Sequence, residues 1–141
     1  MCIRDRSIFD ALNEIKKILS VVNVKTVKLG LEPNISPSDY PIIRIVAGNS
    51  EISTGFDGWS ENFDFKVYCG YKLDEKIGVE NIYKQIYALE NEIKFLLHNT
   101  QIFDGAGLIK FQNTVSDEDT LKNFKVLCLS FRICEMRFME P

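Results

Sequence analysis

Apolar and polar residues alternate strictly from Phe63 to Cys69, and this alternation constrains the fold more than any other stretch of the chain. Successive side chains of a β-strand point to opposite faces of a sheet, so the segment predicts a strand with one buried face. The apolar positions are Phe63, Phe65, Val67 and Cys69, and the polar positions between them are Asp64, Lys66 and Tyr68. Such a strand requires a layer of apolar side chains packed against one face of its sheet.

Two amphipathic helices are predicted to supply that layer, because their apolar residues recur at alternating steps of four and three, the spacing of one helical face. The first helix follows Ser7, a natural N-cap, and places Asp10 near its positive end. The second runs from about Val79 to His98, roughly 30 Å at 1.5 Å per residue. The apolar positions are Ile8, Leu12, Ile15, Leu19 and Val22 in the first helix, and Ile82, Ile86, Leu89, Ile93 and Leu96 in the second, whose apolar face Tyr83, Phe95 and Leu97 widen.

The remaining patterned segments predict strands. Residues 24–31 have the period of a half-buried strand, and Pro41 can begin a second strand over residues 42–47. That second strand is apolar on both faces, so we expect it at the centre of the sheet or against a neighbouring subunit. Residues 108–115 and 124–136 predict a closing hairpin, and we interpret the acidic turn between them, with Asp117, Glu118 and Asp119, as a solvated charge run.

The expected element order is therefore α-β-β-β-α-β-β, which predicts an α+β fold of two layers. We expect a mostly antiparallel sheet with the two helices packed on one face. At 141 residues the chain has the size of one ordinary domain, which we place at residues 7–141. The first six residues, MCIRDR, resemble a leader from translated sequence assemblies and lack the apolar core and cleavage site of a signal peptide.

The composition excludes several classes of protein. The formal charge of -3 and the pI near 5.2 are the opposite of the basic footprint that a phosphate-gripping surface requires. No apolar run approaches the ~20 residues that cross a bilayer, so we expect no membrane association. The cysteines Cys2, Cys69, Cys128 and Cys134 have no C-x2-C spacing, and we interpret Cys69 and Cys128 as small apolar residues of buried strands.

No motif predicts catalysis, a metal or a cofactor. His98 is the only histidine and lies at the end of the second helix, where it suits the negative end of the helix dipole. The glycines and hydroxyls of GNSEISTG, residues 48–55, lack the spacing of a phosphate-binding loop. We therefore expect a protein that is not an enzyme and that holds no cofactor.

A long polar loop is predicted over residues 48–60, between two strands that need only a short turn. It carries Phe56 and Trp59 beside Gly55 and Gly58, where the domain's own core cannot easily bury both rings. Aromatic residues are preferred anchors of protein interfaces, which favours a contact with a partner. The alternative is that the loop folds back and Trp59 caps the core.

Several of these features together resemble the tail terminator and tail-completion proteins of long-tailed bacteriophages. They are the helix at the start, the strand YPIIRI at residues 40–45, the long loop, the strand ending in VYCGY at residues 67–71, and the long helix followed by two closing strands. The resemblance is one of pattern and spans the chain from about Ser7 to Met136.

This resemblance implies a homo-oligomeric ring, commonly a hexamer, in the tail of a virion that is assembled in the host cytoplasm. Such a ring docks on the last ring of the tail tube protein, stops its polymerisation and presents its other face to the head-neck connector protein. DNA passes through its channel without specific binding, which agrees with the acidic balance of the chain. The loop resembles the long hairpin loop that these proteins project toward neighbouring subunits.

The predicted partner interface combines the loop with the preceding strand. Its residues are Phe56, Asp57, Trp59, Glu51 and Ile52 of the loop, and Ile42 and Arg44 of the strand. An uncovered apolar sheet face would also require a partner. A second hypothesis is a small cytoplasmic ligand-binding or regulatory domain, in which Trp59, Tyr68 and Tyr71 line a pocket.

Overall fold

The computed structural model describes residues 7–31, 36–55, 58–74, 76–119 and 123–139. In chain order, the elements are α1 (Ile8–Leu19), β1 (Thr26–Leu29), the short 3-10 helix η1 (Pro37–Asp39), β2 (Ile42–Gly55), β3 (Gly58–Lys72), α2 (Val79–Leu97), β4 (Gln101–Ile102), η2 (Phe103–Gly105), β5 (Gly107–Ser116) and β6 (Phe124–Met139). The first six residues, interpreted above as a leader, lie outside the described part.

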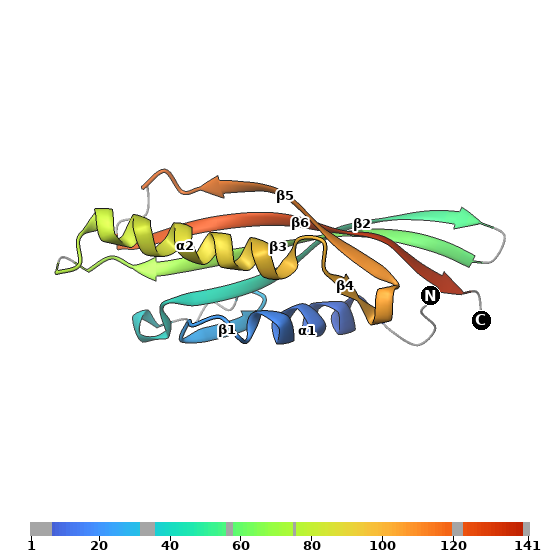
Figure 1. Cartoon of the computed structure of the whole chain (residues 1–141), viewed down its shortest axis with the longest axis horizontal. Coiled ribbons are helices and arrows are strands. Elements are labelled where there is room, and N and C mark those ends of the chain that lie inside the picture. Colours follow the sequence, from blue (N-terminus) through green and yellow to red (C-terminus); the bar gives the residue numbers. More distant parts are fainter. Residues whose placement is uncertain (1–6, 32–35, 56–57, 75, 120–122, 140–141) are drawn as a thin grey trace.

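These strands form one six-stranded sheet in the spatial order β1-β2-β3-β6-β5-β4 (Figure 1). Every neighbouring pair is antiparallel except β1 and β2, which are parallel. The predicted α+β class, the mostly antiparallel sheet and the order of the main elements are confirmed. The two-residue strand β4 was not predicted, because a strand that short leaves no periodic pattern.

Both helices pack against the same face of the sheet. One cluster of buried residues joins α1 and α2 to alternate positions of β2, β3, β5 and β6 and extends along the chain from Ala11 to Met136. At its centre the rings of Phe65 and Phe131 stack with centroids 5.3 Å apart, and Phe111 meets Phe131 edge-on at 5.4 Å. The strict alternation at residues 63–69 is confirmed, since its four apolar residues are all buried.

Helix α1 begins at the predicted cap. The Ser7 hydroxyl accepts a hydrogen bond from the Asp10 N–H, and the Asp10 carboxylate accepts one from the Ser7 N–H, which completes a capping box. The helix ends at Leu19, so the predicted last position, Val22, lies in the turn that follows but is still buried. Helix α2 matches its predicted range, except that Phe95 lies outside the apolar face and is 86 % exposed.

The long loop predicted over residues 48–60 is wrong, because most of it continues β2 and β3 as a paired hairpin. A bulge between Ala47 and Ser50 lets β2 gain one residue over β3, and pairing then continues to Gly55 and Gly58. The residues beyond the bulge carry no apolar alternation, because this part of β2 is exposed to solvent. An exposed antiparallel hairpin of this kind therefore has the sequence pattern of a loop.

We call this hairpin the arm and define it as residues 47–55 of β2 and 58–62 of β3. Figure 1 shows the arm extending past the ends of both helices, with the end of β6 beside it. Gly48 in the bulge allows the two strands to approach closely, since a Cβ atom there would lie 2.6 Å from the Asp64 carbonyl oxygen. The arm is therefore a paired extension of the main sheet.

Candidate interaction surface

The second face of the sheet is not covered by either helix. Its side chains come from the positions between the buried ones, and one row across it runs from Arg44 through Tyr68 and Cys128 to Val115. We call this surface the open face and define it by Arg44, Asp64, Lys66, Tyr68, Val115, Val126, Cys128, Ser130 and Arg132. Most of these residues are half-buried by their neighbours, so the surface mixes charged, aromatic and apolar groups.

Two neighbouring hollows of about 370 and 410 Å³ lie on the open face. They share Lys66, Tyr68 and Ser130, and one extends toward Gly48 while the other reaches Val115. Burial raises the pKa of Tyr68, and its hydrogen bond with Cys128 raises it further, so the phenol stays neutral at physiological pH. The two hollows meet at these shared residues and together form one open depression on the sheet, a shape suited to a protein partner.

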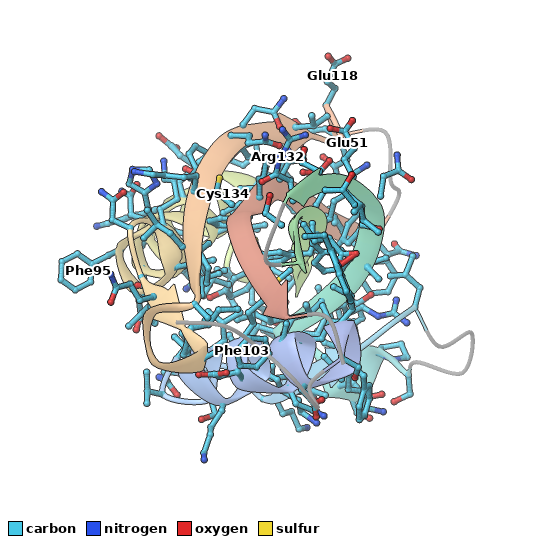
Figure 2. The ribbon with its side chains drawn as sticks, turned by 90° about the vertical axis from the view of Figure 1, so that its right-hand side faces the viewer. Glu51, Phe95, Phe103, Glu118, Arg132 and Cys134 are labelled. Carbon is cyan, nitrogen blue, oxygen red and sulfur yellow. The ribbon has the colours of Figure 1, made fainter. Side chains whose placement is uncertain are left out.

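Asp64 and Arg132 pair directly across β3 and β6 on the open face. Arg132 Nε donates to Asp64 Oδ1 at 2.8 Å and Arg132 Nη2 donates to Oδ2 at 3.3 Å, a two-pronged contact that fixes both side chains. The hydrogen bond with Asp64 raises the pKa of Arg132, and the negative charge of Glu51 raises it less strongly. Figure 2 shows Glu51 of the arm on the same side of the molecule as Arg132 and Cys134.

The arm carries three of the seven predicted interface residues within the described part. Glu51 is exposed, Ile52 is 61 % exposed, and Trp59 is partly buried opposite Thr54 on one side and Phe138 on the other. Phe56 and Asp57 lie outside the described residues. An apolar side chain as exposed as Ile52 gains from a partner that covers it.

The two predicted interface residues of the preceding strand lie elsewhere. Arg44 is half-buried on the open face, in the row that contains Tyr68. Ile42 lies on the same side of β2 as Arg44 and lines a small hollow with Tyr40, Tyr68 and Val126, but it is only 2 % exposed, so we leave it out of the surface considered below. Both residues therefore lie on the part of β2 that precedes the bulge and the arm.

The residues of the predicted ligand pocket do not converge. Tyr68 and Tyr71 are three positions apart on β3, so the alternation of the strand sends them to opposite faces. Tyr71 packs against the core below the helices, where burial raises its pKa, and Trp59 lies in the arm. Hence no single pocket joins these three rings, and the ligand-binding hypothesis loses the feature on which it depended.

The interpretation of the acidic turn as a solvated charge run is wrong for Asp117, whose side chain is 9 % exposed, whereas Asp119 is 52 % exposed but pairs with the same lysine. Lys125 is only 2 % exposed, and its Nζ lies 2.6 Å from Asp117 Oδ1, 3.1 Å from Asp119 Oδ1 and 2.7 Å from the Ser116 hydroxyl. The same Nζ lies 5.1 Å from the ring centroid of Tyr83, whose hydroxyl donates to Asp119. We call these five residues the Lys125 cluster.

One signal in the sequence points to the Lys125 cluster. Lys125 shares its side of β6 with Leu127 and Leu129, so a lysine stands where the alternation requires a buried apolar residue. A buried ammonium needs an ionised partner, and the nearest carboxylates in the chain belong to the preceding turn. The cluster ties the β5–β6 turn to the start of α2, which is a structural role.

The other titratable residues also have structural surroundings. His98 Nδ1 accepts a hydrogen bond from the Phe111 N–H at 2.9 Å, and so joins the end of α2 to β5. Cys69 is fully buried as expected, and burial raises the pKa of its thiol to about 12. In the described ranges, no group of three or more His, Cys, Asp and Glu side chains could hold a metal ion. None of the described helices is long and apolar enough to cross a membrane.

Comparison with known proteins shows a likeness at the level of the fold. No protein-family model matches the chain, and no curated protein sequence matches it. Among solved structures, the chain is similar to a component of a particle described as the virion of a native gene transfer agent (GTA), with a TM-score of 0.58. The alignment covers 86 % of this chain and 90 % of that component at 12 % sequence identity, so the likeness shows a shared fold.

Proposed function

We propose that this protein is a non-enzymatic structural component of a phage-type virion. The observation that carries the proposal is the shared fold. The structural alignment with the component of the gene transfer agent particle covers 86 % of this chain and 90 % of that component. A domain whose sheet has one helix-covered face and one uncovered face also suits a protein that works by packing against neighbours.

Within the virion, we propose the role of tail terminator. In this role, copies of the chain form a ring, commonly a hexamer, that docks on the last ring of the tail tube and stops its growth. The ring then joins the tube to the head-neck connector and leaves a channel through which DNA passes without specific binding. The feature that supports this finer role is the arm, which extends past both helices and can reach a neighbouring subunit (Figure 1).

The proposed contact surface of the arm includes Glu51, Ile52 and Trp59, together with Phe56 and Asp57, which lie between its two strands in the sequence. Arg44 would contribute from the open face. Burial of a side chain as exposed as Ile52 stabilises a contact by about 1.5–3 kcal/mol when its apolar surface is fully covered. A short paired arm also loses little conformational freedom on docking, which favours association.

The test is the growth of tail tubes from the tail tube protein of the same virion. We expect the purified protein to stop polymerisation and to give shorter tubes in electron micrographs as its concentration rises. The double variant Phe56→Ser/Trp59→Ser should lose this activity. The control is Phe95→Ser, which removes an aromatic ring that is 86 % exposed on α2 and lies away from the arm. Tube lengths that do not respond to the wild-type protein would contradict the proposed role.

A further inference from the structure

The sheet has two edges that its own end strands cover only in part. Strand β1 pairs with β2 only along Ile42–Ile45, and β4 pairs with β5 only at Gly107 and Leu108. Within the described ranges, no strand lies against the outer edge of β2 beyond Ile45 or of β5 beyond Phe111. The sheet therefore ends on two unpaired strand segments, residues 46–55 on one side and 112–116 on the other.

The outward hydrogen-bonding groups of β2 follow from its pairing. Gly30 N–H donates to the Ile45 carbonyl at 2.7 Å, so the backbone polar groups of Ile45 point away from β3. Ile45 pairs with Val67 of β3. Farther along β2, Ser50, Ile52 and Thr54 pair with residues of β3 that lie four, six and eight positions from Val67. Because the direction of the backbone groups alternates along a strand, the N–H and C=O groups of these three residues also point away from β3. Their N–H and C=O groups form a regular row along the open edge of the arm.

The same reasoning applies to β5. The Phe111 N–H donates to His98, so it points away from β6, and its partner there is Phe131. Thr114 pairs with Leu129, at an even separation from Phe131, and its backbone groups therefore point outward too. The bulge after Phe111 keeps this direction while it adds one residue to β5.

Neither open segment carries the residues that usually prevent strands from pairing between molecules. The β2 segment reads VAGNSEISTG and the β5 segment reads QNTVS, with no lysine, arginine or proline and with Glu51 as the only charge. Proteins that remain single usually place lysine, proline, a bulge or a covering element on a long edge. Each open segment has a bulge near its start, but pairing beyond the bulge is regular, at residues 50–55 and 113–116. These regular stretches are suited to pairing with another strand.

From these observations we infer that the open edge of β2 in one copy pairs with the open edge of β5 in the next copy. Strand β2 is antiparallel to β3, β3 to β6 and β6 to β5, so β2 and β5 run in opposite directions. Copies related by rotation about an axis near the strand direction would thus bring the two edges together as an antiparallel pair. The inference rests on the proposed function, because a ring requires a head-to-tail contact of this kind.

The contact also requires a displacement along the strands. Ile52 pairs with Glu61 of β3. Thr114 pairs with Leu129 of β6, which in turn pairs with Val67 of β3. Glu61 and Val67 are six residues apart along β3, so Ile52 and Thr114 lie at different heights on the sheet. A neighbour that pairs Thr114 with Ile52 is therefore shifted by about 20 Å along the strands. A closed ring accommodates such a shift by tilting every strand against the ring axis, as β-barrels do.

Proline substitution tests the inference, because proline removes an outward N–H that the isolated fold does not use. We expect Ile52→Pro and Thr114→Pro each to raise the dissociation constant for self-association by about tenfold or more in light scattering over a range of concentrations. Ile52→Thr and Thr114→Ser, which keep the N–H, should associate as wild type does. Circular dichroism and thermal melting show whether each variant is folded.

Mixing the two proline variants identifies the pairing partners. Each variant retains one intact edge, so a head-to-tail contact predicts that the mixture forms particles of two copies while each variant alone stays single. Normal assembly by Thr114→Pro would instead indicate β2 paired with β2, and would overturn the inference. Normal assembly by both variants, or a wild type that is single at every concentration, would overturn it as well.

Amide hydrogen exchange of the wild type provides a second measurement if a proline variant does not fold. The outward amides of Ser50, Ile52, Thr54 and Thr114 should exchange at least about tenfold more slowly in concentrated than in dilute protein. The inward amides of Glu51 and Ser53 should be slow in both, and serve as internal controls. Unchanged outward amides would overturn the inference, whereas tube growth tests the proposed function separately.

Discussion

The Nζ atom of Lys125 lies within 3.1 Å of two carboxylates and one hydroxyl and is almost completely shielded from water. Lys125→Met would remove the cation that lies 2.6 Å from Asp117, whose side chain is 9 % exposed. Because removal of one partner of a buried ion pair is costly, we expect the free energy of unfolding to fall by about 3 kcal/mol in urea denaturation. Lys84→Met on the exposed side of α2 is the control, and an equally small effect of both substitutions would contradict the structural role of the cluster.

The ionisation of Asp117 makes the stability of the protein depend on pH. Burial raises the pKa of Asp117, but the hydrogen bonds from Lys125 and from the N–H groups of Asp119 and Val126 lower it more, and the net pKa lies below its ordinary value. A carboxyl whose folded pKa is depressed stabilises the fold at pH values above its unfolded pKa. That stabilisation is lost as the pH falls through the folded pKa.

We therefore expect the free energy of unfolding to fall between about pH 5 and pH 2, and the fall to be shallower in Asp117→Asn. Chemical denaturation at a series of pH values measures both slopes. Asp74→Asn, on an exposed residue of the β3–α2 connection, is the control and should keep the wild-type slope. Identical slopes in wild type and Asp117→Asn would show that other carboxyls cause the acid sensitivity.

At the scale of elements, the arm depends on the bulge in β2. The bulge places Gly48 where a Cβ atom would lie 2.6 Å from the Asp64 carbonyl oxygen, and a backbone atom in a paired strand cannot move away cheaply. We expect Gly48→Ala to destabilise the protein by about 1–3 kcal/mol, the usual cost of overpacking. It should also speed amide exchange in the arm, as measured by NMR, whereas Ser50→Ala on the exposed part of β2 should do neither.

The whole molecule has one described core, since buried residues from Ala11 to Met136 belong to a single cluster. We therefore propose that residues 7–141 form one domain and expect one cooperative unfolding transition in calorimetry. Phe131→Ala, which removes a ring packed between Phe65 and Phe111, should lower the free energy of unfolding by about 3–5 kcal/mol and keep one transition. Two separate transitions, with only one of them shifted, would contradict the single domain.

Much of this fold could be predicted from the sequence because its signals are local. Two patterns indicate which side chains are buried on folding: the alternation at residues 63–69 and the four-three spacing of both helices. The buried residues of the structure follow the same periods. The Ser7 cap is equally local, since it depends on residues three positions apart. Strand β4 was missed because a two-residue strand shows no period, and the end of α1 was placed too late because the buried Val22 continues the helical spacing past Leu19.

The candidate site depended on contacts between distant segments, which only the tertiary structure decided. Sequence reasoning drew attention to residues 48–60, but pairing between β2 and β3 made that segment an arm, since exposed strands carry no apolar alternation. The burial of Ile42 could not be predicted, because burial depends on what packs over a residue. The chain by itself determined its layers and most of its elements through side-chain periodicity. The open face, the two open edges and the ion partners of Lys125 were decided by how strands distant in sequence align, because backbone pairing places side chains without leaving a local pattern.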